Sequence, residues 1–294
     1  MKKIEKGSQW RKWDLHFHTP SSYDYGDKSV TNHEIIDTLS ANDISVVAIT
    51  DHHVIDIERI TELQSLGKTK GITVLPGIEF LSDSRGRAPI HFIGIFAEDC
   101  NLTHIWGQIE NKTNISKIKG EGAKINEVYC NLETTIELIK NLGGLTSIHA
   151  GEKSNSVENI THSLPHGEAQ KTLIAKSVDF YELGKPEDKE GYLNAVFPAI
   201  KKHIPMIICS DNHNIRKYIS KENCWIKADT TFEGLKQVVY EAKQRVRIQA
   251  LKPQEKAGYQ VIDSVKISHS DFHSQNIHFN QNLNSIIGGR STGK

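Results

Sequence analysis

The segment Trp13-Asp14-Leu15-His16-Phe17-His18 places two histidines two residues apart. On an extended segment, side chains at positions i and i+2 project from the same side, so the two imidazoles can bind one metal ion. A lone His-x-His is weak evidence, because the chain holds 15 histidines and a half-buried strand with polar alternate positions also explains the pair. The metal interpretation therefore depends on whether similar side chains recur elsewhere.

Side chains that can bind metals recur at or near the ends of five further apolar runs of strand length. Residues 44–50 lead into Asp51-His52-His53, and residues 72–76 lead into Gly77-Ile78-Glu79. The other runs are residues 90–96, which contain His91, residues 144–148 before His149, and residues 205–210 before Asp211-Asn212-His213. Because α/β barrels and sheets place their sites at the carboxyl ends of strands, the pattern predicts a multi-metal hydrolytic site.

These motifs resemble the PHP domain (polymerase and histidinol phosphatase). The family pattern opens with Asp-Leu-His-x-His and continues with Thr-Asp-His, Pro-Gly-x-Glu, a histidine on the next strand, an isolated histidine and Ser-Asp-x-His. The matching positions are residues 14–18, 50–52, 76–79, His91, His149 and residues 210–213. The resemblance spans roughly Trp13 to Arg247, and it implies a distorted (β/α)7 barrel with a trinuclear metal site at the carboxyl ends of its strands.

The resemblance also implies how the ligands divide among three metals. The three sets are His16, His18, Glu79 and Asp211 for the first metal, Glu79, His91 and His149 for the second, and Asp24, His52 and His213 for the third. Glu79 is thus expected to bridge two ions. Two alternatives stay open: Asp27 could replace Asp24, and His53 could replace His52, although Thr-Asp-His favours the first histidine.

The expected ligands suit two to three divalent transition metals. Mixed imidazole and carboxylate ligands bind Zn, Mn or Fe, and the sequence does not choose among them. Such ions can hold a phosphate and supply hydroxide at neutral pH, so phosphoester hydrolysis needs no protein nucleophile. We assign catalytic importance to Asp51, Glu79 and Asp211, with Asp51 expected to orient a ligand rather than to bind metal.

Substrate phosphates would need cations near the mouth of the site. The candidates lie in loops that follow the motifs and are Arg85, Arg87, Lys153 and Arg216. Surface cations are usually only solvated, so each of these four is a weaker prediction than any metal ligand.

Composition is consistent with an α/β enzyme of this size. The formal charge is zero, with 36 basic and 36 acidic residues, so nucleic-acid binding would have to come from local basic patches. Lysines within residues 111–124 and basic residues within 243–252 form two such stretches, which solvated faces explain more simply. The four cysteines form no close pair, no segment is long and apolar enough for a membrane span, and we expect a cytoplasmic protein with reduced thiols.

Helical signals alternate with the apolar runs. Thr31-Asn32-His33-Glu34 is a capping box that predicts a helix through Leu39. Apolar residues at helical spacing predict further helices over residues 56–66, 132–142 and 231–243. The alternation of strand and helix predicts a parallel β architecture.

The last residues predict a different unit. Residues 251–260 are a polar linker, and an apolar strand at residues 283–287 precedes Gly288-Gly289-Arg290-Ser291-Thr292-Gly293-Lys294. That is a G-x-x-x-x-G-K motif, which resembles the P-loop that opens an ABC or SMC-type ATPase domain. The domains expected are a PHP phosphoesterase at 1–250, the linker at 251–260, and an amino-terminal ATPase fragment at 261–294 with Gly288, Gly293 and Lys294 as an incomplete nucleotide site.

The function expected is therefore a metal-dependent phosphoesterase, most simply a nuclease acting on DNA or RNA. The fusion resembles TrlF-like bacterial proteins associated with phage defence, in which an SMC-like ATPase would control the nuclease in cis; ATP and Mg²⁺ would bind only the longer protein. Two alternatives stay open, a phosphatase of nucleotides or small phosphate esters and a non-catalytic, metal-stabilised regulatory module. We expect no membrane partner, and homo-oligomerisation stays open.

Overall fold

The structure is a computed structural model that describes residues 8–82, 89–160, 165–219, 222–254, 256, 258–268, 276–281, 283–285 and 287–288. The strands are β1 (Gln9–Phe17), β2 (Ile44–Ile49), β3 (Thr73–Leu81), β4 (His91–Ile95), β5 (Leu145–Ala150), β6 (Phe180–Leu183), β7 (Met206–Ile207), β8 (Cys224–Ala228), β9 (Val246–Ile248), β10 (Ser264–Lys266) and β11 (Asn276–His278). The helices are α1 (Asn32–Ala41), α2 (Ile57–Lys70), α3 (Leu102–Lys112), α4 (Ser116–Gly120), α5 (Leu132–Asn141), α6 (Pro165–Ser177), α7 (Asp188–Gly191), α8 (Phe197–Ile200), α9 (Phe232–Tyr240) and α10 (Ala242–Arg245).

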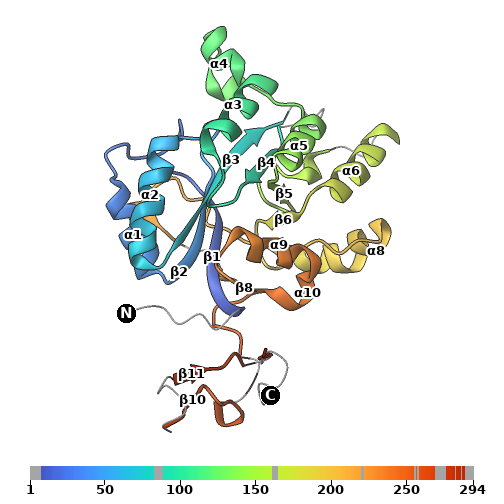
Figure 1. The fold of residues 1–294 in the computed structure, drawn as a ribbon. Coiled ribbons are helices and arrows are strands. Elements are labelled where there is room, and N and C mark those ends of the chain that lie inside the picture. The colour runs from blue at the N-terminus through green and yellow to red at the C-terminus, as the bar shows by residue number, and fades with distance from the viewer. Residues whose placement is uncertain are drawn as a thin grey trace.

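The main body is one nine-stranded sheet in the order β7-β6-β5-β4-β3-β2-β1-β8-β9. Its edge strands β7 and β9 contact each other, so the sheet curls into a nearly closed barrel. Figure 1 shows helices packed around the outside of this sheet, with α1 and α2 on one side and α5 and α6 on another. The mixed α/β barrel expected from the sequence is therefore present.

The sequence-predicted helices are confirmed. Thr31 caps α1 by accepting from the backbone N–H of Glu34, whose carboxylate accepts from the N–H of Thr31 in return, which completes the capping box. The other three predicted segments form α2, α5, and α9 followed by α10. Each presents an apolar face to the sheet, as its spacing of hydrophobic residues indicates.

The predicted barrel differs from the structure in two features. The sheet has nine strands instead of seven, and the expected parallel pairing is present only among β1, β2 and β3 and among β5, β6 and β7. Strand β4 is antiparallel to β3 and to β5, because the chain between Leu81 and His91 is too short to hold the crossover that a parallel neighbour requires. Strand β8 pairs antiparallel with β1, and β9 pairs antiparallel with β8. Strand β8 thus covers the edge of β1 that faces away from β2, and β9 extends the sheet beyond β8.

The barrel interior divides into an apolar half and a polar half. Alternate residues of a strand face the same side. Inward-facing Leu75, Ile93 and Phe180 therefore pack together inside the barrel, and α9 contributes Leu235 and Val238 to the same cluster. Farther along the same inward faces lie the polar side chains of the expected site. The apolar cluster thus forms a buried floor beneath the polar cluster.

The last residues form a separate small hairpin. Strands β10 and β11 pair antiparallel with each other and not with the barrel sheet, and Figure 1 shows them below the barrel. The strand expected at residues 283–287 is not formed in its described part, where Leu283 and Ile287 are exposed, because no neighbouring strand pairs with it. Gly288 is partly exposed coil, and Gly293 and Lys294 lie outside the described residues. The ATPase fragment and the domain boundaries stay predictions.

Within the described residues, no helix combines the length and the apolar character that a membrane crossing would require.

We predict that Phe80→Ala lowers the free energy of unfolding by about 3–5 kcal/mol. Phe80 pairs with Phe92 across β3 and β4, both rings are fully buried, and their centroids lie 5.1 Å apart. Urea unfolding followed by circular dichroism measures the change. The control is Tyr240→Ala at an 82% exposed position, which should stay within about 0.5 kcal/mol of the wild type; an equally small change for Phe80→Ala would contradict the assigned core.

Candidate metal centre

All of the expected metal ligands converge at one end of the barrel. Each of the nine belongs to at least one group whose donor atoms lie within 4.8 Å of one another. The ligands follow or end parallel strands, except His91, which opens β4. Because β4 runs antiparallel to its neighbours, its amino end lies beside their carboxyl ends. Strand direction therefore explains why this histidine comes first in its strand.

The ligands expected for the first metal bring four donor atoms close together. The Nε2 atoms of His16 and His18 lie 2.9 Å apart, and each is 3.1 Å from Oε2 of Glu79. Oδ1 of Asp211 lies 3.4 Å from Nε2 of His16 and 3.5 Å from Nε2 of His18. Two nitrogen atoms that bind one tetrahedral ion at ~2.0–2.1 Å lie about 3.3 Å apart, so these separations fit a metal ligand set.

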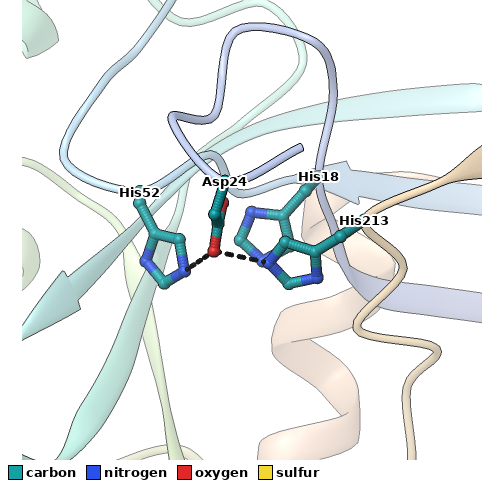
Figure 2. Close-up of side chains that lie close together, drawn as sticks. All are labelled: His18, Asp24, His52 and His213. Atoms are coloured by element: carbon teal, nitrogen blue, oxygen red, sulfur yellow. Dashed lines mark ion pairs between the residues drawn. The ribbon is translucent and has the colours of Figure 1, made fainter. Parts of the chain in front are cut away.

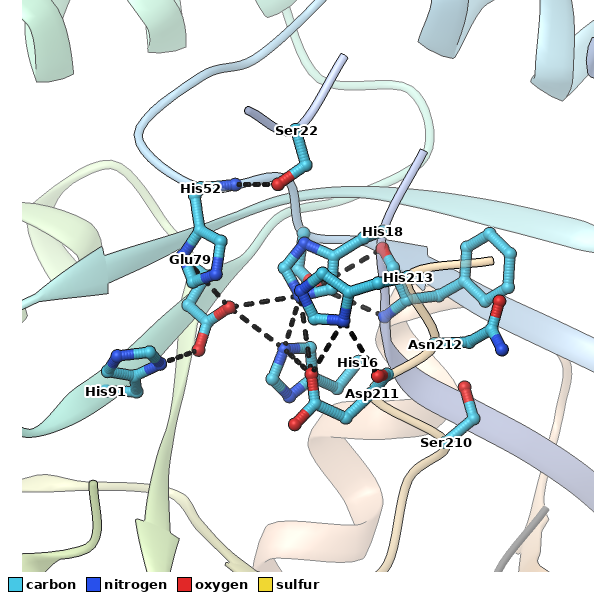
Figure 3. A network of polar contacts seen from close by, with 12 residues as sticks. His16, His18, Ser22, His52, Glu79, His91, Ser210, Asp211, Asn212 and His213 are labelled. Carbon is cyan, nitrogen blue, oxygen red and sulfur yellow. Dashed lines mark hydrogen bonds and ion pairs between the residues drawn. The ribbon is translucent and has the colours of Figure 1, made fainter. Parts of the chain in front are cut away.

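Glu79 lies at the centre of the cluster (Figure 3). Its Oε2 is 3.3 Å from Nδ1 of His52, and its Oε1 is 2.6 Å from Nδ1 of His91. Oε1 is also 3.6 Å from Nε2 of His149. The two oxygens of Glu79 therefore lie near donor atoms that belong to different ligand groups, as a bridging ligand requires.

A further group gathers His18, Asp24, His52 and His213 (Figure 2). Oδ2 of Asp24 lies 3.3 Å from Nε2 of His52 and 3.2 Å from Nε2 of His213. The ring of His213 stacks on that of His18 with centroids 3.9 Å apart. This side of the cluster is open to solvent, because the side chains of Asp24 and His213 are 33% and 31% exposed.

The structure distinguishes the two open alternatives. Asp27 forms an ion pair with Arg216 instead of contacting the cluster, whereas Asp24 contacts two of its histidines. The ring of His53 packs edge-on against Phe80 with centroids 6.2 Å apart, and burial lowers the pKa of His53 to about 4. Asp24 and His52 therefore occupy the cluster, and Asp27 and His53 do not.

The expected division of ligands among three metals agrees with the geometry only in part. His149 groups with His16 and Asp211, while His91 groups with His52 and Glu79. The resemblance had placed His149 and His91 on the same ion. The two rings lie 5.3 Å apart, so their assignment to a shared ion stays a prediction.

The buried carboxylates of the cluster need positive charge nearby. Burial raises the pKa of Glu79, but the charges of His16 and His52 and hydrogen bonds from His16 and His18 outweigh it and hold that pKa well below its ordinary value. Burial lowers the pKa of His18, and hydrogen bonds to Asp211 and Glu79 raise it to about 9. The carboxylates are thus charged and must face cations, either protons on the imidazoles or metal ions. The donor set of imidazole nitrogens and carboxylate oxygens fits Zn, Mn or Fe.

Surrounding side chains orient the donors. Both oxygens of Asp51 accept hydrogen bonds from Thr19, at 2.6 Å from its backbone nitrogen and 2.6 Å from its Oγ1, so Asp51 fixes the turn after His18. Asp14 accepts from the backbone N–H of Ser210 and from the hydroxyl of Tyr218, which holds the turn that carries Asp211. Asp51 and Asp14 thus each hold a turn beside the expected ligands, and the orienting role of Asp51 towards a metal ligand stays a prediction.

Sequence reasoning missed Glu182, a fully buried residue on β6. Its Oε2 lies 2.9 Å from Nδ1 of His16, and its Oε1 lies 2.8 Å from Nζ of Lys153. The signal was an acid in the short apolar run Phe180-Tyr181-Glu182-Leu183, the same pattern that identified Glu79. Asn155 was also missed; its Nδ2 lies 3.0 Å from Nε2 of His91.

The expected phosphate contacts are placed differently from the prediction. Lys153 is buried in ion pairs with Glu182 and Asp211 instead of facing the mouth, because two carboxylates need its charge. Arg216 is half-exposed and pairs with Asp27 and Glu34. Arg85 and Arg87 lie outside the described residues. Within the described part of the chain, none of the four stands at the cluster as an unpaired phosphate contact.

No family model and no curated protein matches the chain. Its fold is shared with a solved two-domain protein from Bacteroides vulgatus that contains a predicted PHP-like metal-dependent phosphoesterase, at 15% identity and a TM-score of 0.54 over 84% of this chain and 67% of that chain. It is also shared with a Bifidobacterium adolescentis protein described as a metal-dependent phosphoesterase, at 14% identity and a TM-score of 0.51 over 79% of this chain and 96% of that chain. The likeness establishes a PHP-like fold.

We predict that Zn²⁺ binding at pH 7 releases protons. His18 carries a proton there, since hydrogen bonds to Asp211 and Glu79 overcome burial and raise its pKa to about 9, and a metal must displace that proton. Zn²⁺ affinity should therefore rise as the pH rises towards 9. Titration in weakly buffered solution with a pH indicator measures the release.

The control is the double variant His16→Ala, His18→Ala. Elemental analysis should find at least one metal ion fewer per chain than in the wild type. Unchanged metal content, or Zn²⁺ binding without proton release by the wild type, would contradict the ligand assignment.

Proposed function

We propose that this protein is a metal-dependent phosphoesterase. The observation that carries the proposal is the convergence of nine imidazole and carboxylate side chains around Glu79 at the end of a PHP-like barrel. Bound divalent ions would supply a water that ionises near neutral pH and positive charge for phosphate oxygens. The buried apolar floor beneath the cluster lowers the local dielectric constant, which strengthens electrostatic interactions next to it.

The chain's own residues then prepare the reaction. His16, His18 and Asp211 would hold one position, and Asp24, His52 and His213 would hold a more exposed one, with Glu79 in contact with histidines of both sets. The exposed position is where a phosphate can approach, because Asp24 and His213 are each about one third accessible. Asp51 and Asp14 fix the turns that carry these donors, so little rearrangement is needed when substrate binds.

We further propose that the substrate is a nucleic acid. Tyr23 and Tyr129 are each 40% exposed, and the ring of Tyr23 lies 5.3 Å from that of His52. Burial raises the pKa of Tyr23, and the charges of Asp24, Glu79 and Tyr129 raise it further. Aromatic faces beside a hydrolytic centre can stack with bases regardless of sequence. This observation supports a nuclease or nucleotide hydrolase over an enzyme for non-aromatic esters.

A phosphatase of nucleotides or small esters is the second candidate. The formal charge of zero favours it, because a chain without excess positive charge attracts the nucleic-acid backbone weakly. A non-catalytic regulatory module is a weaker proposal, since such a module has no need for a complete ligand set. Control by an ATPase in cis rests only on the G-x-x-x-x-G-K motif and remains part of the proposal.

We predict that Glu79→Gln and Asp211→Asn each reduce phosphoester hydrolysis by at least about 100-fold. Substituting a residue that only orients a metal ligand already lowers metal affinity or activity by about 10–100-fold. Activity is measured with bis-p-nitrophenyl phosphate, p-nitrophenyl phosphate and labelled oligonucleotides, and folding by circular dichroism. Asp27→Asn, a carboxylate close to the cluster but paired with Arg216, is the control and should keep wild-type activity. Near-normal activity of the first two variants would place the hydrolytic centre elsewhere.

We predict that Tyr23→Ala raises KM for a single-stranded oligonucleotide about tenfold, since base stacking on an aromatic side chain contributes ~1–3 kcal/mol. KM for an oligonucleotide of abasic sites should change less than twofold, because no base is available to stack. Tyr23→Phe keeps the ring and should behave as wild type. Equal losses on both substrates would instead indicate that Tyr23 supports the neighbouring His52.

A further inference from the structure

A closed ring of polar contacts joins Lys153 to two sides of the metal centre. Nζ of Lys153 lies 2.8 Å from Oε1 of Glu182 and 2.9 Å from Oδ2 of Asp211. The second oxygen of Glu182 lies 2.9 Å from Nδ1 of His16. The second oxygen of Asp211 lies 3.4 Å from Nε2 of the same histidine. Each carboxylate is thus shared between the lysine and His16.

The position of Lys153 is built into the fold. Its side chain is 3% exposed, so the ammonium group exchanges water for these two carboxylates. Its backbone packs against Gly184, where a Cβ atom would lie 2.7 Å from the nitrogen and 2.9 Å from the Cα of Lys153. Gly184 follows Glu182 by two residues, so one segment provides both the partner of the ammonium group and the space for its backbone. Such burial distinguishes Lys153 from a surface lysine that could turn towards a substrate.

The ring restricts which atoms can donate to a metal. Because Oδ2 of Asp211 is held by Lys153, only Oδ1 is directed towards His16 and His18. Nδ1 of His16 lies 2.9 Å from Glu182 and 3.4 Å from Nε2 of His149, whereas its Nε2 lies beside His18 and Glu79. A carboxylate that used both oxygens would add a ligand and would bring its whole negative charge closer to the ion.

We propose that Lys153 is an internal cation and positioning residue of the metal centre, which limits Asp211 to one donor oxygen and reduces the negative charge around the ion held by His16, His18, Glu79 and Asp211. The inference rests on the metal centre of the proposed function, and it concerns metal binding instead of hydrolysis. A lysine that only fills space would stabilise the site. An internal cation repels the metal ion, so its removal should strengthen metal binding.

The experiment measures Co²⁺ affinity by chelator competition and coordination by visible absorption, whose intensity falls as the number of ligands rises. Lys153→Met should bind Co²⁺ about tenfold more tightly, because a buried positive charge next to a ligand is removed. Its absorption should weaken as Asp211 donates through both oxygens. Glu182→Gln should act in the opposite direction, with about tenfold weaker binding, since it removes a negative charge and replaces the charged acceptor of His16 with a neutral amide.

The control variants distinguish an effect of the lysine charge on Co²⁺ affinity from an effect on folding. Lys185→Met removes a lysine that pairs with Glu152 on the surface near the same loop, and its Co²⁺ affinity should stay within twofold of the wild type. Lys153→Gln is neutral but can still hydrogen-bond both carboxylates, so it tests the charge if the methionine variant does not fold. It should also bind Co²⁺ more tightly than the wild type does.

Opposite shifts for the lysine and glutamate variants would support the proposal. Weaker binding by both, or affinity within twofold of the wild type for Lys153→Met, would overturn it. A wild-type chain that binds no Co²⁺ would overturn both this inference and the metal centre. A wild-type chain that binds Co²⁺ but cleaves no phosphoester would overturn the proposed function alone.

Discussion

The constraint on which the site depends is the burial of several carboxylates inside a barrel. Glu79 and Glu182 are almost completely buried, and an isolated buried carboxylate is costly unless a cation or hydrogen-bond donors compensate it. The chain meets this constraint in two ways. Imidazoles of five histidines surround Glu79, and Lys153 holds Glu182 and Asp211. The imidazoles can exchange their protons for metal ions, whereas the lysine charge is permanent.

This difference divides the cluster into a fixed part and an exchangeable part. Around Glu182, both carboxylate oxygens already have partners at hydrogen-bond distance within the protein. Around Glu79 the partners are ring nitrogens at 2.6 to 3.6 Å, all of them groups that can bind metal. Metal ions should therefore gather on the Glu79 side, and Glu182 should act through His16. The exposed Asp24 and His213 extend the exchangeable part towards solvent.

Sequence alone predicted which side chains would gather at one end of the barrel, because residue type and strand position are both local properties. His16 and His18 are two residues apart, and Glu79, His149 and Asp211 each follow or close an apolar run, so their common location needed only a parallel core of strands. The direction of β4 was not predictable from its own residues. It depends on the short connection after β3, and it brings His91 to the site from the opposite end of its strand.

Lys153 and Glu182 were harder to interpret from sequence, because the local sequence around each has a common explanation that involves no site. A lysine in a polar loop usually faces water, and an acid in a four-residue apolar run usually marks a strand's exposed side. Only the distances between segments show that the two neutralise each other and that Gly184 makes room for the contact. The same holds for Asp51, whose neighbour His52 suggested a role near that histidine, although its partner is Thr19. Motifs thus identify donor atoms in this chain, whereas the groups that control those donors come from tertiary contacts between loops that the motifs do not describe.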